Sequence, residues 1–225
     1  MRIDIISAVP ETMQSYIENS IIKIARDKGI VEINLHNLHD YSQSKHKKID
    51  DYPFGGASGM LLTCQPIFSL IEELKSQREY DEIIFTSAEG EKFNQSSANY
   101  LSLKKNIIIL AGRYKGVDQR VRDNLITKEY SLGDFILTGG EVAALAICDA
   151  TIRLLPGALG DSEAALTDSF MNGMLEEAQY TRPADFKGLK VPDVLLSGNH
   201  KAIEIWRQEN SYNKTKLLRP DLLDW

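Results

Sequence analysis

The sequence predicts an α/β fold whose sheet is largely parallel, followed by a smaller helical unit. Strand-like and helix-like segments alternate up to about residue 155, which is typical of parallel strands joined by crossover helices. The pattern changes after Pro156-Gly157, where small and polar residues without a clear period predict a linker. With 225 residues, the chain is long enough for one substantial domain and an appendage.

Short segments rich in Ile, Val, Leu, Phe or Tyr are predicted as strands over residues 3–8, 31–35, 82–86, 106–111 and 130–137. Apolar residues at helical spacing predict helices over residues 11–28, from Pro66 onward, and over 96–104, 117–126 and 141–155. In the second unit, a helix should begin near Asn199 and run past Trp206, which we expect in the core.

The composition is that of a globular protein, with 43% hydrophobic and 26% charged residues. The apolar runs fall far short of the roughly 20 residues that cross a bilayer, so no membrane association is expected. Residues 1–10 lack the features of a signal peptide, and we therefore expect a cytoplasmic protein. Cys64 and Cys148 lie far apart and are expected to be buried thiols, not a disulfide or a zinc site.

The net charge of -6 argues against a protein that coats nucleic acid non-specifically through an excess of cations. Residues 181–225 are nevertheless basic, with eight Lys and Arg against six Asp and Glu. A second basic cluster, residues 45–48, lies in a polar stretch that reads as a loop. These two regions could contact phosphates, or they could simply be solvated surface.

Three glycine-bearing turns follow predicted strands, at residues 87–90, 112–116 and 138–141. Ligands of open α/β sheets bind at the carboxyl ends of the strands, where glycine lets the backbone approach them closely. The three turns could therefore form one pocket, although each alone is most often just a turn. Neither G-x-G-x-x-G nor G-x-x-x-x-G-K-[ST] occurs, which weighs against dehydrogenases and P-loop enzymes.

A fourth turn, residues 50–60, is dense in glycine and could be either a binding loop or a flexible surface loop. His36 and His39 lie three apart on a strand-like segment, which places them on opposite faces with no third ligand nearby. No metal site is predicted.

Two runs of residues resemble the motifs of a known family. Gly112-Arg113-Tyr114 with Gly116-Val117-Asp118, and then the run 131–141 (SLGDFILTGGE), look like the motifs of bacterial tRNA (guanine-N1)-methyltransferases, which belong to the knotted SPOUT class. The resemblance covers essentially the whole chain, because further matches occur at residues 50–60, 153–157, 168–170, 180–183, 195–200, 206–207 and 219–220.

The resemblance implies an α/β SPOUT domain with a parallel sheet and a deep trefoil knot over residues 1–157. A flexible linker over 158–170 and a small helical tRNA-binding domain over 171–225 would follow. It also implies a homodimer with its active site at the subunit interface. The activity implied is transfer of the methyl group of S-adenosylmethionine to N1 of the guanosine immediately 3′ of the anticodon (position 37) in tRNA. The product would be 1-methylguanosine, made on the anticodon stem-loop.

The resemblance assigns cofactor binding to residues in the three glycine-bearing turns and in the segment before the last of them. These residues are Phe85, Thr86, Ser87, Ala88, Gly112, Arg113, Tyr114, Ser131, Leu132, Gly133, Phe135, Ile136, Leu137, Gly139 and Gly140. By the same resemblance, the residues assigned to substrate binding are His46, Asp50, Gly55, Gly59, Ser169, Arg182, Lys201 and Arg207. For the charged ones among them, ordinary surface solvation is the alternative.

Guanine N1 carries a proton and is a poor nucleophile near neutral pH, so the reaction needs a positioned base. Asp168 matches the family's catalytic aspartate and is the expected base, with the cap of a helix as its alternative role. Charge that develops toward guanine O6 needs a cation or an N–H donor, and Arg153 is the expected one. The alternative for Arg153 is a surface ion pair at a helix end.

The sequence departs from the family at several positions. Lys115 stands where the family usually has glutamate, so a magnesium dependence carried by that side chain does not follow for this chain. Ala164 and Thr167 replace a usual serine and glutamate, and Ala57 replaces a glycine of the fourth turn.

Two rival interpretations remain open. One is a SPOUT enzyme that methylates a ribose 2′-oxygen or another base. The other is an RNA-binding protein that has kept the fold and lost the cofactor.

Overall fold

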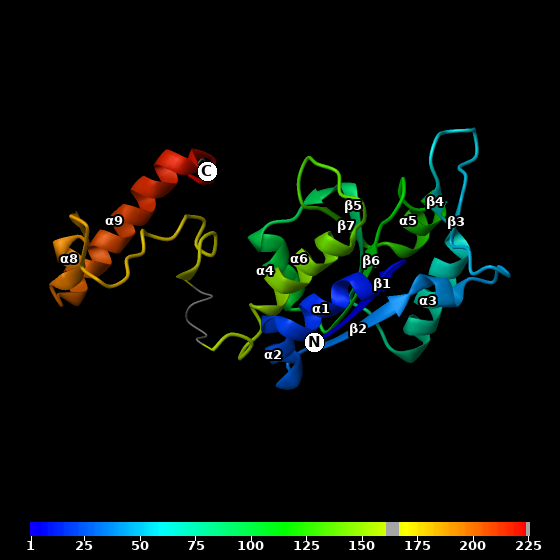
Figure 1. Ribbon diagram of the computed structural model, residues 1–225, viewed down its shortest axis with the longest axis horizontal. Coiled ribbons are helices and arrows are strands. Elements are labelled where there is room, and N and C mark those ends of the chain that lie inside the picture. The colour runs from blue at the N-terminus through cyan, green and yellow to red at the C-terminus, as the bar shows by residue number, and fades with distance from the viewer. Residues whose placement is uncertain (161–166, 224–225) are drawn as a thin grey trace. The chain divides into compact units, whose positions relative to one another are not determined.

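The computed structural model describes residues 1–160 and 167–223 (Figure 1). The chain divides into two compact units, Met1–Ser162 and Glu163–Trp225. The first unit holds a five-stranded sheet in the order β2-β1-β6-β5-β7, and every pair of neighbours is parallel. Its strands are β1 (Arg2–Ser7), β2 (Glu32–Asn37), β5 (Glu82–Lys92), β6 (Asn106–Ala111) and β7 (Lys128–Ser131). The predicted parallel α/β sheet is confirmed.

Strand β6 shows why the sheet is covered on both faces. Ile107 and Ile109 point into one hydrophobic core, whereas Ile108 and Leu110 point into the other. A strand that alternates between two apolar cores needs helices on both sides, as parallel sheets generally have. One face is covered by α1 (Glu11–Asn19), α2 (Ile21–Asp27), α4 (Gln95–Ser102) and α6 (Glu141–Ile152), and the other by α3 (Cys64–Gln77) and α5 (Gln119–Leu125) (Figure 1).

Three predicted boundaries are wrong. The helix expected over 11–28 breaks at Ser20, whose backbone is extended and whose Oγ accepts a hydrogen bond from the Ile22 N–H at the start of α2. The strand expected over 130–137 ends at Ser131, because the chain turns at Gly133 with φ +153°. Strand β5 continues beyond residue 86 to Lys92, with a register shift between Thr86 and Glu91.

The fourth glycine-rich turn is enclosed by a short antiparallel hairpin, β3 (Asp50–Asp51) and β4 (Leu61–Leu62). The hairpin is hydrogen-bonded to the turn that follows β6. Leu62 N donates to Gly116 O at 3.0 Å, and Lys115 N donates to Met60 O at 3.0 Å. These bonds hold the hairpin beside the carboxyl end of β6.

The second unit is organised by α9 (His200–Leu218), preceded by the short α8 (Asp193–Leu196) and the hairpin of β8 (Asp185–Phe186) and β9 (Leu189–Lys190). Helix α9 begins where the sequence predicts, and the Asn199 side chain caps it by accepting from Ala202 N. Its two buried side chains are polar. Ser211 Oγ donates to Leu175 O, and Thr215 Oγ1 accepts from Leu175 N at 2.9 Å, so they fix the preceding segment along the helix.

The burial predictions for Trp206 and Cys64 are wrong, whereas that for Cys148 is confirmed. Trp206 is only half-buried and lies beside Tyr180, with ring centroids 6.4 Å apart, so it is not a core residue. Cys148 is buried, and burial raises the pKa of its thiol to about 12. Cys64 is only half-buried. Among the described helices, none is long and apolar enough to span a membrane.

A charged network lies inside the first unit around Asp4, whose side chain is 0% exposed. Its oxygens lie 2.7 Å from Arg2 Nε, His36 Nε2 and Tyr80 OH. Burial alone would raise the pKa of Asp4, but the hydrogen bonds from His36, Arg2 and Tyr80 outweigh it and hold the pKa well below its ordinary value. The stability that Asp4 contributes is therefore present above about pH 4 and is lost as the pH falls toward the depressed pKa.

We expect Asp4→Ala to lower the free energy of unfolding by about 3 kcal/mol, because it leaves Arg2, His36 and Tyr80 without their shared acceptor. Urea denaturation at neutral pH measures this change. The matched control is Asp27→Ala, which removes an exposed i,i+4 partner of Lys23 and should cost at most about 0.5 kcal/mol. Equal losses in the two variants would show that the buried network contributes no more to the free energy of unfolding than an exposed ion pair does.

Candidate active site

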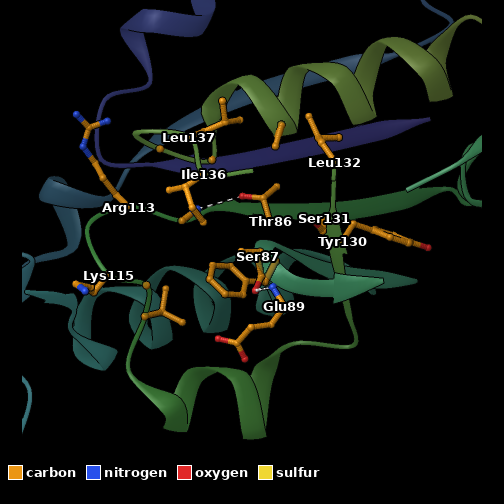
Figure 2. Close-up of a pocket in the computed structure, with 18 of the residues that line it drawn as sticks. Thr86, Ser87, Glu89, Arg113, Lys115, Tyr130, Ser131, Leu132, Ile136 and Leu137 are labelled. Carbon is orange, nitrogen blue, oxygen red and sulfur yellow. Dashed lines mark hydrogen bonds between the residues drawn. The ribbon is translucent and has the colours of Figure 1, made fainter. Parts of the chain in front are cut away.

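A pocket lies over the carboxyl ends of β5, β6 and β7, which are neighbours in the sheet (Figure 2). Every residue that the sequence assigns to cofactor binding, from Phe85 to Gly140, lines this one pocket. The structure thus brings together three segments that are far apart in sequence, but residues 87–90, predicted as a turn, lie within β5. Sequence reasoning missed further lining residues, namely Glu89, Lys115, Gly116, Val117, Arg122, Tyr130, Thr138 and Ala143.

The floor of the pocket is made where Thr86 of β5 touches the turn after β6, which in turn touches the turn after β7. Gly140 N donates to Gly112 O at 2.6 Å, and Gly112 N donates to Thr86 Oγ1 at 3.2 Å. A Cβ at Gly140 would lie 2.0 Å from Thr86 Oγ1 and 2.5 Å from Gly112 N, so no side chain fits there. Glycine is required because the backbones themselves are in contact.

Behind this floor, Glu141 opens helix α6 as a buried carboxylate. Its Oε1 accepts from Ser7 Oγ at 2.8 Å, and its Oε2 lies 3.6 Å from Arg113 Nη1. An acidic side chain in the first turn of a helix is also favoured by the helix dipole. Glu141 therefore neutralises and positions Arg113 at the edge of the pocket.

A second cation, Arg122 of α5, is held by two carboxylates. Its guanidinium donates to Glu129 at 2.8 Å and to Glu89 at 2.9 Å, and these hydrogen bonds raise the pKa of Arg122. The same group lies 5.9 Å from the centroid of the Phe85 ring. Arg122 thus ties α5 to Glu89 in the second half of β5 and to Glu129 of β7.

Tyr114 links the pocket to the glycine-rich hairpin. Its backbone is left-handed, with φ +59°, and its hydroxyl is in contact with Asp50 of β3. Burial, and then the charge of Asp50, raise the pKa of Tyr114. A tyrosine held in a left-handed conformation at a pocket wall is a strained feature typical of functional sites.

Comparison with known proteins decides the family. The whole chain, residues 1–225, matches the family described as tRNA (Guanine-1)-methyltransferase TrmD. The chain belongs to this family. It is 57% identical over 224 residues to the tRNA (guanine-N(1)-)-methyltransferase of Flavobacterium johnsoniae, covering 100% of this chain and 99% of that protein. The proteins of the same name from Chlorobaculum tepidum (53% over 223 residues, 99% of this chain and 97% of that protein) and Bacteroides thetaiotaomicron (52% over 224 residues, 100% of each) are similar to it as well.

The other residues that the family resemblance assigns lie outside the lining of the pocket. In the first unit, Asp50, Gly55 and Gly59 lie in the glycine-rich hairpin, beside the pocket and not in its lining. His46 is exposed in the basic loop before β3, and Arg153 caps the carboxyl end of α6. Asp168, Ser169, Arg182, Lys201 and Arg207 belong to the second unit and are not among the residues that line the pocket.

Asp168 sits in a well-anchored turn of the second unit. Met171 N donates to Asp168 O, and Phe170 N donates to Met174 O at 2.7 Å, which closes the turn. Ser169 Oγ accepts from Glu176 N at 3.0 Å, next to the segment held along α9. Of the cations assigned to RNA in this unit, Arg207 pairs with Glu177 at 3.4 Å, whereas Arg182 and Lys201 are exposed.

In the described ranges 1–160 and 167–223, no group of three or more His, Cys, Asp or Glu is placed to hold a metal ion. Ala57 and Thr167 fall in described segments, but Ala164 lies outside the described residues.

Proposed function

We propose that the pocket of the first unit binds S-adenosylmethionine and that the protein transfers its methyl group to N1 of the guanosine immediately 3′ of the anticodon in tRNA. The product is 1-methylguanosine. The observation that carries this proposal is the family match over residues 1–225, with relatives named tRNA (guanine-N(1)-)-methyltransferase over the full length of both chains. Because tRNA is processed in the cytoplasm of bacteria, the protein acts there.

The pocket suits this cofactor. Backbone of the turns after β6 and β7 meets at Gly112 and Gly140 beside β5, which leaves room for a ligand to approach main-chain atoms that side chains would otherwise cover. Leu132, Ile136 and Leu137 supply apolar wall for a nucleobase, while Thr86, Ser87 and Ser131 supply polar groups (Figure 2). When bound, the cofactor supplies an electrophilic methyl group.

The first unit carries the deep trefoil knot of the family, and residues 1–157 form the cofactor-binding domain. Support for the knot comes from the contact between the turns after β7 and β6, where Gly140 is hydrogen-bonded to Gly112 and Arg113 is bridged to Gly139. Residues 158–170 link it to residues 171–225, which bind the anticodon stem-loop. The protein is a homodimer in which Asp168 of one subunit serves the pocket of the other.

Asp168 accepts the N1 proton of guanine as the methyl group transfers in line. The turn that carries it is closed by hydrogen bonds, which support a fixed position for the Asp168 backbone. Arg153 stabilises the negative charge that develops on guanine O6. A magnesium dependence carried by the side chain at position 115 is not expected, because Lys115 stands where the family usually has glutamate.

The anticodon arm binds the two basic regions, residues 45–48 and residues 181–225. His46 with the lysines of residues 45–48 forms an exposed loop next to the hairpin that carries Asp50, Gly55 and Gly59. Arg182, Lys201 and Arg207 extend the contact over the second unit together with Ser169. Contacts of this kind position the RNA through its phosphates and weaken with added salt.

Arg153→Met should lower kcat for methyl transfer by about 100-fold, because it removes one donor that acts only as charge develops. Binding of S-adenosylhomocysteine should be unchanged, since Arg153 does not line the pocket. Single-turnover kinetics with saturating cofactor measure the first quantity, and calorimetry measures the second. A variant with wild-type turnover would remove Arg153 from the mechanism.

Nucleoside analysis tests the function itself. Unmodified tRNA transcript is incubated with the protein and labelled S-adenosylmethionine, and is then digested to nucleosides. The label should elute as 1-methylguanosine. Label in a 2′-O-methylated nucleoside would assign the protein to ribose methylation, and the absence of both transfer and cofactor binding would favour an RNA-binding protein without catalysis.

A further inference from the structure

The cations of the pocket differ in how they are neutralised. Arg113 is paired with Glu141, and Arg122 is paired with both Glu129 and Glu89. The ammonium of Lys115 makes no ion pair or hydrogen bond with any residue in the described part of the chain. Lys115 is therefore the lining side chain whose positive charge is left for a ligand.

The position of Lys115 is set by the glycine-rich hairpin. Its backbone N–H donates to Met60 O, and its side chain runs over Gly59, where an added Cβ would lie 2.7 Å from Lys115 Cγ. The preceding Tyr114 is left-handed, and Gly116 follows with φ +129°. This tight turn keeps the base of the side chain at the pocket wall, and its stem lies over Gly59 of the hairpin.

The two sides of the pocket differ in chemistry. Figure 2 shows Lys115 and Arg113 together on one side, whereas Leu132, Ser131 and Tyr130 lie on the other. A ligand with an apolar ring at one end and a negative charge at the other would be oriented by this difference. S-adenosylmethionine has such ends, because its adenine is aromatic and its amino-acid end carries a carboxylate.

We infer that Lys115 binds the carboxylate of the amino-acid end of S-adenosylmethionine and so fixes that end beside the glycine-rich hairpin. This inference rests on the proposed function of the pocket. It makes Lys115 a specificity-determining residue for the cofactor: it selects donors that carry the carboxylate over donors that lack it. A lysine suits this task because its ammonium donates in any direction and its stem is flexible.

The test compares two ligands that differ in a single group, S-adenosylmethionine and its decarboxylated form. Isothermal titration calorimetry gives the Kd of each for the wild-type protein and for Lys115→Met. We expect the wild type to bind the carboxylated ligand about tenfold more tightly. Lys115→Met should bind both ligands alike, at the wild-type affinity for the decarboxylated form, and Lys115→Arg should keep most of the preference.

The control is Lys105→Met, which removes the same charge from an exposed position next to the amino end of β6 and should keep the full preference. If Lys115→Met retains the preference, or if it loses affinity for both ligands equally, Lys115 does not bind the carboxylate. If the wild type binds neither ligand, the proposed function of the pocket is wrong and this inference falls with it. Binding of both ligands without a preference would overturn the inference and leave the proposed function intact.

Discussion

Asp168→Asn should lower kcat for guanine-N1 methylation by about 1000-fold while leaving the affinity for S-adenosylhomocysteine unchanged. The amide keeps the size and shape of the side chain but cannot accept the N1 proton, and general bases contribute roughly 100- to 10,000-fold. Because Asp168 does not line the pocket, the affinity for S-adenosylhomocysteine should not change. Single-turnover rates and calorimetry measure the two quantities separately.

Raising the pH should partly restore the Asp168→Asn variant, since guanine N1 then loses its proton without help from the enzyme. The wild-type rate should show a weaker rise over the same range. Asp193→Asn, an exposed carboxylate of the same unit at the start of α8, is the matched control and should behave as wild type. If Asp168→Asn showed wild-type kcat, the residue would be a structural cap and another group would have to be the base.

Gly140→Ala should reduce the affinity for S-adenosylhomocysteine at least tenfold, because the new Cβ has no space between the turns. It would lie 2.0 Å from Thr86 Oγ1 and 2.5 Å from Gly112 N, and it would break the contact between Gly140 N and Gly112 O. Overpacking of this kind also costs roughly 1–3 kcal/mol of stability. Calorimetry with S-adenosylhomocysteine and urea denaturation of the same preparation measure both effects.

The control for Gly140→Ala is Gly160→Ala, where an added Cβ meets nothing within 4 Å and where both properties should stay at wild-type values. A Gly140→Ala protein that remains folded and binds the ligand normally would contradict the account of the pocket floor.

Much of this architecture could be predicted from local pattern. The apolar run Ile107 to Leu110 is long enough for a strand and too uniform for a one-sided sheet, and the structure buries it between two cores. The Asn199 cap and the spacing of α9 were likewise readable. The glycine-bearing segments indicated the pocket because glycines that follow parallel strands lie at the carboxyl edge of the sheet, where ligands bind.

Other features could not be read because they depend on contacts distant in sequence. The segment after Ser131 is as apolar as a strand, yet Phe135, Ile136 and Leu137 form a pocket wall because Gly133 turns the chain back toward Gly112. Arg122 lines the pocket only because α5 packs with one particular face against the sheet. No spacing in the sequence could indicate that Arg122 would be fixed by Glu129 and Glu89.

The most direct test of the central claim is methyl transfer from labelled S-adenosylmethionine to two tRNA transcripts that differ only in G or A immediately 3′ of the anticodon. We predict that label appears as 1-methylguanosine in the G transcript alone, which would establish the reaction, the base and the site together. Equal labelling of both transcripts would contradict the assigned position, and no labelling of either would contradict the assigned reaction.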